Sequence, residues 1–200
     1  RKMPEFIADM PDNAGLPVVQ QFLQVNSALR KANAETIYQI TRKSEAQLFW
    51  EGTFLRLPNA ANRARFADAR EYRHKGKVID HQFHMGIDLA SLALSPIPAA
   101  NAGKVVFAES LGIYGQTVII DHGFGLFSLY GHCSSLEVAV GQMVARGDII
   151  AKTGTTGLAG GDHLHYGMLV GDTYVNPIEW WDAQWIENNI SSKLKAVPAS

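Results

Sequence analysis

The sequence lacks several features that define whole classes of protein. Cys133 is the single cysteine, so no disulfide can form within the chain. No apolar run approaches the ~20 residues that a helix needs to cross a membrane. Lysine and arginine number 18 against 19 aspartates and glutamates, which gives a net charge of −1. That balance leaves no basic footprint for nucleic acid. We therefore expect no nucleic-acid partner and no transmembrane segment in this chain.

Two further absences bear on ligands and processing. The glycine-rich stretch TGTTGLAGG lacks the lysine and serine or threonine that end a phosphate-binding P-loop, so we do not interpret it as one. The chain begins with Arg1 and not with methionine, which favours a mature form or a fragment. A signal peptide or anchor would then have been removed. We expect Cys133 to be a small buried residue and not a reactive thiol.

The second part of the sequence has the pattern of a β protein. From about Val78 onward, glycine turns separate short apolar runs: KVVFAE, TVIIDHG, GLFSLYGH, LEVAV, DIIAKTG and HLHYGMLV. Regular short strands of this kind predict a mainly β fold, with an antiparallel sheet forming a sandwich or barrel-like core. A chain of 200 residues allows one such domain plus an extension.

The first part of the sequence predicts a mostly helical N-terminal extension. Val18, Phe22, Val25 and Leu29 have helical spacing, which indicates an amphipathic helix. In order, we expect an extended lead-in over 1–16, helices over 17–34 and 35–47, a half-buried strand over 49–57, and an irregular link over 58–77. The predicted division is an extension at 1–65, a β domain at 66–190 and a tail at 191–200. The helices would either cover a cleft and keep the protein latent, or only buttress the sheet.

The C-terminal stretch IEWWDAQWIENNI predicts a short helix. Its residues Trp180, Trp181 and Trp185 would pack on the core or form a surface that stacks on carbohydrate, and we favour packing.

Histidines carry the strongest chemical signal. His84 and Asp88 lie in FHMGIDLA, His132 in LYGHCSS, and His163 and His165 in GDHLHYG. A catalytic zinc takes three nitrogen or oxygen ligands from the protein and keeps one position open. We expect His84, Asp88 and one histidine of the HxH pair to converge on one ion.

The spacing within these motifs supports strands. His163 and His165 are two residues apart, so both side chains point to the same face of a strand. Gly86 lies between His84 and Asp88 and disfavours a helix, which predicts a strand followed by a bend. The remaining histidines, His74, His81 and His122, are expected to be surface or structural residues, with His122 in a turn.

FHMGIDLA, LYGHCSS and GDHLHYG resemble the three signatures of the lysostaphin/LytM-type zinc metallopeptidases, a family of peptidoglycan endopeptidases. The resemblance covers roughly residues 66–182 and implies a core of the duplicated hybrid motif type. By motif position, the implied zinc ligands are His84, Asp88 and His165. The implied catalytic histidines are His163 and His132. Cys133 stands where a bulky apolar residue is expected, and the segment after Asp88 is slightly long, but neither feature touches a ligand.

The implied activity is hydrolysis of peptide bonds in the cross-links or stem peptides of bacterial peptidoglycan. A zinc-activated water would be the nucleophile, because zinc lowers the pKa of its water to about 7. Of His132 and His163, one would orient or deprotonate the water and the other would stabilise the oxyanion. The sequence leaves that division open, and imidazole and carboxylate ligands also accept other divalent ions.

The resemblance favours the periplasm or another extracytoplasmic part of the cell envelope. The target would be a D-Ala–diaminopimelate cross-link in a bacterium with an outer membrane, or a glycine bridge in one without. Arg70 and Tyr72 would either contact a substrate carboxylate or form the rim of the cleft. No regulatory protein partner can be identified from the sequence.

Two other functions are weighed against the peptidase. A module that activates other wall hydrolases would not need the intact set of His84, Asp88 and His165. A phosphocarrier domain uses paired histidines but has no need for Asp88.

Overall fold

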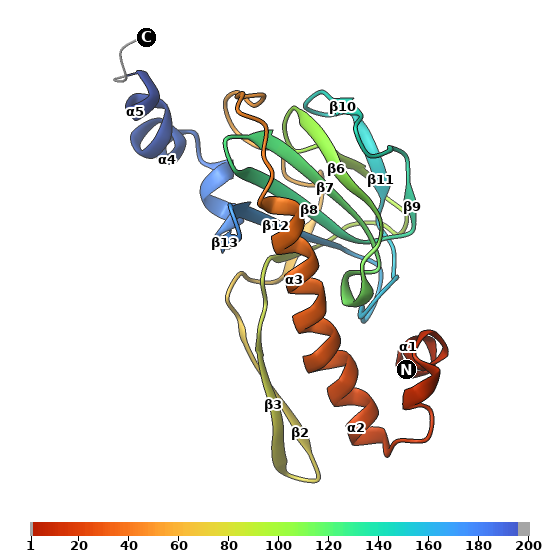
Figure 1. Cartoon of the computed structure of the whole chain (residues 1–200). Coiled ribbons are helices and arrows are strands. Elements are labelled where there is room, and N and C mark those ends of the chain that lie inside the picture. The colour runs from red at the N-terminus through yellow and green to blue at the C-terminus, as the bar shows by residue number, and fades with distance from the viewer. Residues whose placement is uncertain (1, 196–200) are drawn as a thin grey trace.

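The computed structural model describes residues 2–195, apart from the side chains of residues 9 and 11. Antiparallel strands form the body of the molecule, and helices flank it at both ends of the chain (Figure 1). The prediction of a mainly β fold with an antiparallel core is confirmed. The main sheet has eight strands, β1 (Ala61–Ala64), β4 (Ile87–Ala90), β12 (Leu164–Val170), β8 (Leu126–Cys133), β7 (Gln116–Gly123), β6 (Gly103–Ser110) and β10 (Met143–Val144) in that order, with β13 (Thr173–Val175) paired to β12.

Two smaller sheets complete the β structure. Within the described part of the chain, the main sheet follows an open path from β1 to β10 and does not close into a barrel. A second sheet packs against it and has the strands β5 (Pro96–Pro98), β11 (Ile149–Lys152) and β9 (Ser135–Leu136). The third is a hairpin of β2 (Ala69–His74) and β3 (Lys77–Phe83), which projects from the body beside the N-terminal helices (Figure 1).

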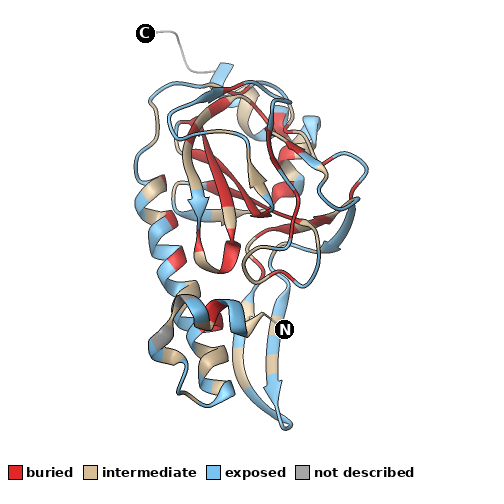
Figure 2. Cartoon of the chain, turned by 90° about the vertical axis from the view of Figure 1, so that its right-hand side faces the viewer, coloured by how far each residue is buried: buried red, intermediate tan, exposed pale blue. Residues whose placement is uncertain are grey.

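The central strands of the main sheet are covered on both faces. All eight residues of β8 are buried, and the buried residues concentrate in this sheet (Figure 2). Alternate side chains point to opposite faces of a strand. Phe127 and Leu129 therefore pack with Val25 and Ile37 of the N-terminal helix, whereas Tyr130 belongs to a cluster on the other face. The N-terminal helix is thus part of the core.

The N-terminal helices differ from the predicted pair. One continuous helix is formed by α2 (Val18–Leu23), the π-helical turn η2 (Gln24–Leu29) and α3 (Arg30–Thr41). The predicted break near residue 34 is wrong, because no glycine or proline interrupts the segment. The helix also ends before residue 47. Asp121 accepts hydrogen bonds from the Ser44 hydroxyl at 2.8 Å and from the Glu45 backbone N–H at 2.7 Å, which holds the chain in a loop there.

The predicted lead-in at 1–16 is also wrong. It contains α1 (Met3–Asp9) and a 3₁₀ turn, η1 (Pro11–Asn13). A proline in the first turn of α1 is compatible with a helix start. Phe6 is buried in the same cluster as Val25 and Ile37, so tertiary packing stabilises a helix of only two turns.

Two predictions fail between the helix and the β core. Residues 49–57 form no strand, because their backbone N–H groups donate to carbonyls that belong to no neighbouring strand. The Phe54 N–H donates to the Trp180 carbonyl at 2.9 Å, and the Leu55 N–H donates to the Ala100 carbonyl at 2.7 Å. The link at 58–77 is not irregular, because it contains β1 and β2. The β2–β3 hairpin is mostly exposed and therefore lacks the apolar alternation that marks a half-buried strand.

A further 3₁₀ turn, η3 (Gly112–Tyr114), lies between β6 and β7. The predicted C-terminal helix is confirmed as a chain of short helical pieces. These pieces are η4 (Pro177–Trp181), α4 (Ala183–Ile186), η5 (Glu187–Ser191) and α5 (Ser192–Lys195). Trp180 is buried, and Trp181 and Trp185 pack against the same cluster, so the tryptophans pack on the core as predicted. Of the predicted tail, residues 196–200 lie outside the described residues. None of the helices formed by residues 2–195 is both long and apolar enough to span a membrane.

His122 has a different environment from the turn predicted for it. It lies near the end of β7 and is fully buried. Its Nδ1 donates to the Ala102 carbonyl at 2.7 Å, and its Nε2 lies 2.7 Å from the Ser128 hydroxyl. Burial lowers the pKa of His122 to about 4, so the ring is neutral at pH 7. His74 and His81 are exposed and Cys133 is buried, all as predicted.

This buried histidine predicts a pH dependence of stability. The unfolded chain takes up a proton near pH 6.5, whereas the folded chain resists it down to about pH 4. As the pH decreases from 6.5 to 4, the unfolding free energy of the wild type should therefore fall relative to that of His122→Gln, by on the order of 3 kcal/mol. Urea denaturation of both proteins at pH 7, 5.5 and 4.5 measures this difference. A difference that stays constant with pH would contradict the role given to His122.

Candidate metal centre

The centre is built on the pairing of β4 with β12. In this antiparallel pair, Asp88 lies directly opposite His165. On its other side β12 pairs with β8, where Gly131 lies opposite His165 and places His132 next to it. His163 directly precedes β12 and pairs with Gly154 in a single antiparallel β-bridge. Three separate sequence motifs therefore meet at one end of the sheet.

Gly86 allows His84 to join this group. Strand β3 ends at Phe83, the chain bends, and β4 begins at Ile87, so the predicted strand with a bend is confirmed. A Cβ atom at Gly86 would lie 2.8 Å from Cε1 of the His165 ring and 2.6 Å from the Tyr166 carbonyl oxygen. Any side chain there would displace the His165 ring, so the bend requires glycine for close approach.

Three donor atoms of these residues form a small triangle. His84 Nε2 lies 2.9 Å from Asp88 Oδ1, His165 Nδ1 lies 3.0 Å from the same oxygen, and the two nitrogens are 3.0 Å apart. Tetrahedral zinc with ligands at ~2.0–2.1 Å separates its donor atoms by ~3.3 Å. The triangle thus matches the size of a three-ligand zinc site, and a shift of a few tenths of an ångström would admit the ion.

The protonation of His84 strengthens the case for a cation. Its Nδ1 lies 2.8 Å from the Arg65 carbonyl oxygen, which can only accept a hydrogen bond. The proton therefore resides on Nδ1, and Nε2 directs a lone pair at the Asp88 carboxylate oxygen. Two lone pairs facing each other repel unless a proton or a metal ion lies between them. An Nδ1–H bonded to a carbonyl is also the usual support of a metal-binding histidine. The donor set therefore fits zinc.

Burial and charge keep the centre ready to bind a cation. His84 and His165 are buried and Asp88 is half-buried. Burial alone would raise the pKa of Asp88, but the rings of His163, His165 and His84, which donate hydrogen bonds to it when they are protonated, outweigh burial and hold that pKa well below its usual range. Asp88 is therefore a carboxylate at neutral pH. Burial lowers the pKa of His165, which favours the neutral imidazole that a metal requires.

His132 and His163 lie beside the triangle and are oriented in the same way. The Thr156 carbonyl accepts from Nδ1 of His132 at 2.9 Å, and the Gly161 carbonyl accepts from Nδ1 of His163 at 2.7 Å. Both rings therefore carry a lone pair on Nε2, and the ring centroids are 4.8 Å apart. His163 Nε2 lies 3.6 Å from Asp88 Oδ1. The structure thus brings together all five residues selected from the sequence.

The two histidines differ in backbone strain and in charge. His132 has a φ of 65°, a left-handed conformation that a non-glycine residue adopts only when its surroundings enforce it. Burial lowers the pKa of His132 to about 3, which makes its ring a neutral acceptor. Burial also acts against protonation of His163, but the Asp88 carboxylate and the Gly161 carbonyl outweigh it and raise the pKa.

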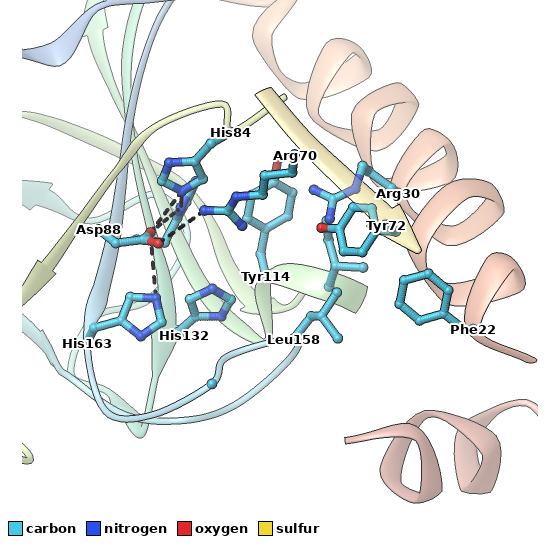
Figure 3. A pocket seen from close by; sticks show the side chains of 13 residues that line it. Phe22, Arg30, Arg70, Tyr72, His84, Asp88, Tyr114, His132, Leu158 and His163 are labelled. Atoms are coloured by element: carbon cyan, nitrogen blue, oxygen red, sulfur yellow. Dashed lines mark hydrogen bonds and ion pairs between the residues drawn. The ribbon is translucent and has the colours of Figure 1, made fainter. Parts of the chain in front are cut away.

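A cavity of about 290 Å³ opens over the centre (Figure 3). The five residues line its inner end, and Arg70 lies next to them, with Nη2 3.6 Å from Asp88 Oδ2. Sequence reasoning singled out Arg70 and Tyr72, but it did not predict that Phe22, Arg30 and Tyr114 also line the cavity. Phe22 and Arg30 come from the N-terminal helix, where their spacing signals only a helical face. Tyr114 follows Gly112, whose φ of 42° marks a tight turn but no ligand.

Comparison with known proteins identifies the relatives of this centre. The model of peptidase family M23 matches residues 82–177, which include all five site residues. The DD-carboxypeptidase/endopeptidase Mpg of Neisseria meningitidis is 37% identical over 97 residues, 48% of this chain and 22% of Mpg. The murein hydrolase activator EnvC of Escherichia coli is 37% identical over 84 residues, 42% of this chain and 20% of EnvC. The chain thus matches about a fifth of the length of these relatives.

Solved structures agree with the sequence matches. A Pseudomonas aeruginosa protein described as an M23 peptidase superposes with a TM-score of 0.63 at 29% identity, over 78% of this chain and 62% of that one. The catalytic domain of lysostaphin from Staphylococcus simulans superposes with a TM-score of 0.54 at 25% identity, over 64% of this chain and 96% of that domain. Residues 82–177, just under half of the chain, thus form a domain of peptidase family M23.

Proposed function

We propose that this protein is a zinc-dependent endopeptidase that hydrolyses peptide cross-links or stem peptides of bacterial peptidoglycan. The observation that carries the proposal is the triangle of His84 Nε2, Asp88 Oδ1 and His165 Nδ1, in which three electron-pair donors lie within about 3.0 Å of one another. Buried donors of this kind repel unless a cation neutralises them. The substrate class is carried over from relatives such as ShyA of Vibrio cholerae, which is named a peptidoglycan DD-endopeptidase.

In this proposal the triangle holds the zinc, and His132 and His163 perform proton transfer. When bound, zinc would polarise the scissile carbonyl and lower the pKa of a water molecule to about 7. The Nε2 atoms of His132 and His163 can each accept a proton from water or donate one to the oxyanion and the leaving amine. The Thr156 and Gly161 carbonyls keep both rings oriented for this. Hydrolysis at this centre would take place in the periplasm or elsewhere in the cell envelope, where peptidoglycan lies.

The similarity to EnvC favours one alternative, a module that activates other murein hydrolases. An activator has no need of a metal centre, whereas here the three donors, the two further histidines and their supporting carbonyls are all in place. The alternative predicts that the protein alone releases no peptide but raises the rate of a separate wall hydrolase. A digestion with and without such a hydrolase separates the two functions.

One prediction of this function concerns zinc affinity. His165→Ala removes one of three ligands, so the equilibrium constant for zinc binding should fall by more than about 100-fold. Competition with a chromogenic chelator measures that constant. His81→Ala is the matched control, because His81 is an exposed histidine on β3 outside the centre. Equal zinc affinity in the wild type and His165→Ala would show that the metal binds elsewhere.

The second prediction concerns catalysis without metal loss. His163→Ala should keep its zinc but release soluble peptides from purified peptidoglycan about 100- to 10,000-fold more slowly, since general acid–base catalysis contributes that much. Chromatography of the released peptides gives the rate, and metal analysis of the same sample gives the zinc content. His74→Ala, another exposed histidine, should retain the wild-type rate. An unchanged rate in zinc-loaded His163→Ala would exclude the role proposed for His163.

A further inference from the structure

The outer part of the cavity carries an excess of positive charge. Among the described residues that line it, Arg30 and Arg70 are cationic and Asp88 is the one carboxylate. The two arginines come from different elements, Arg30 from the start of α3 and Arg70 from β2, and both lie on the same side of the centre (Figure 3). A divalent ion at the proposed zinc site would increase this excess. The cavity is therefore suited to an anionic group of the substrate.

Arg30 is held in place without a charged partner. Its Nε and Nη2 donate to the backbone oxygen and the side-chain Oδ1 of Asn26, at 3.1 and 3.2 Å. Asn26 is fully buried and donates to Asp80 Oδ2 on the hairpin at 2.8 Å, which fixes it in turn. Among the side chains that the structure describes, no carboxylate forms an ion pair with Arg30. These two bonds fix the position of the guanidinium, and its Nη1 has no hydrogen-bond acceptor among the described side chains and backbone atoms.

Arg70 is also incompletely paired. Its Nη2 lies 3.6 Å from Asp88 Oδ2, which is too long for a good hydrogen bond, and the side chain is 39% exposed. Asp88 is already shared among three histidines. Planar guanidinium groups bind carboxylates through parallel N–H donors, and they do so most strongly where water is partly excluded.

The aromatic residues of the cavity define where a carboxylate would lie. Phe22 and Tyr72 contact each other with ring centroids 5.3 Å apart and line the end of the cavity farthest from the histidines (Figure 3). Figure 3 shows the Arg30 side chain beside Tyr72, farther from the histidines than Arg70 and Tyr114. Arg30 therefore lies between the metal centre and the aromatic end.

We propose that Arg30 and Arg70 form a carboxylate-binding subsite that selects peptides carrying a free carboxylate close to the scissile bond. The inference rests on the proposed peptidase function, because it assigns a specificity to the same cavity. Two carboxylates of a cross-linked peptide have this chemistry: the C-terminal one and the side-chain one of diaminopimelate.

The test uses one cross-linked peptide in three forms, with all carboxylates free, with the C-terminal one amidated, and with the side-chain one amidated. Amidation removes the charge and leaves the size almost unchanged. The zinc-loaded full chain should show a kcat/KM about 10- to 100-fold lower for one of the amidated forms, chiefly through KM. That form identifies the carboxylate that binds. Equal rates on all three forms would overturn the proposal.

Arg30→Gln is the decisive variant, because Arg30 makes no hydrogen bond or ion pair with the zinc-ligand triangle, whereas Arg70 lies next to Asp88. It should lower kcat/KM on the free peptide to the value for the amidated form and leave the amidated form unaffected. Arg30→Lys keeps the charge without the planar fork and should give an intermediate preference. Arg42→Gln, at the C-terminal end of the same helix, should behave as the wild type. An unchanged preference in folded Arg30→Gln would overturn the proposal.

The subsite and the peptidase function can fail separately. If the wild type hydrolyses none of the three peptides, the peptidase proposal fails, and calorimetric titration of the intact peptides then tests the subsite alone. Tighter binding of the free form, lost in Arg30→Gln, would support the carboxylate subsite. Equal affinity for all three forms would overturn it.

Discussion

The register between β4 and β12 is the constraint on which the rest of the site depends. It places Asp88 opposite His165, so a carboxylate and an imidazole meet across two hydrogen-bonded strands. A slip of one residue would turn either side chain to the other face of the sheet. The register is secured by burial, because Leu89 and Leu164 are directly paired and pack into the core beside the site. Hydrophobic packing therefore holds in place a group of polar side chains that would otherwise repel one another.

The same principle operates around the metal centre. Backbone carbonyls of Arg65, Thr156 and Gly161 each accept from the Nδ1 of one histidine and leave its Nε2 free. These carbonyls belong to loops, and the loops are held by the sheets from which they extend. The N-terminal helix contributes at a larger scale. It covers one face of the main sheet through Val25 and Ile37 and extends Arg30 to the cavity, so it both buttresses the core and forms part of the site.

The sequence predicted the β core and the five site residues because both leave local signals. Short apolar runs between glycines mark strands, and HxH places two imidazoles on one face. Gly86 correctly predicted a bend. The choice of His165 over His163 for the triangle came only from family resemblance, since both fit the spacing. The assignment of roles to these residues and the domain boundaries at 65 and 190 stay predictions.

The failures share a different physical cause, namely dependence on tertiary contacts. Helix α1 is stabilised by the burial of Phe6, and residues 49–57 bind carbonyls distant in sequence in place of a strand neighbour. Arg30 lines the cavity because folding brings the N-terminal helix next to the β2–β3 hairpin, and no local sequence pattern predicts that contact. The central claim, that His84, Asp88 and His165 hold zinc, is tested most directly by anomalous X-ray diffraction at the zinc edge. We predict one peak at ~2.0–2.2 Å from His84 Nε2, Asp88 Oδ1 and His165 Nδ1. No peak there in a zinc-loaded crystal, or a peak on other atoms, would contradict the account.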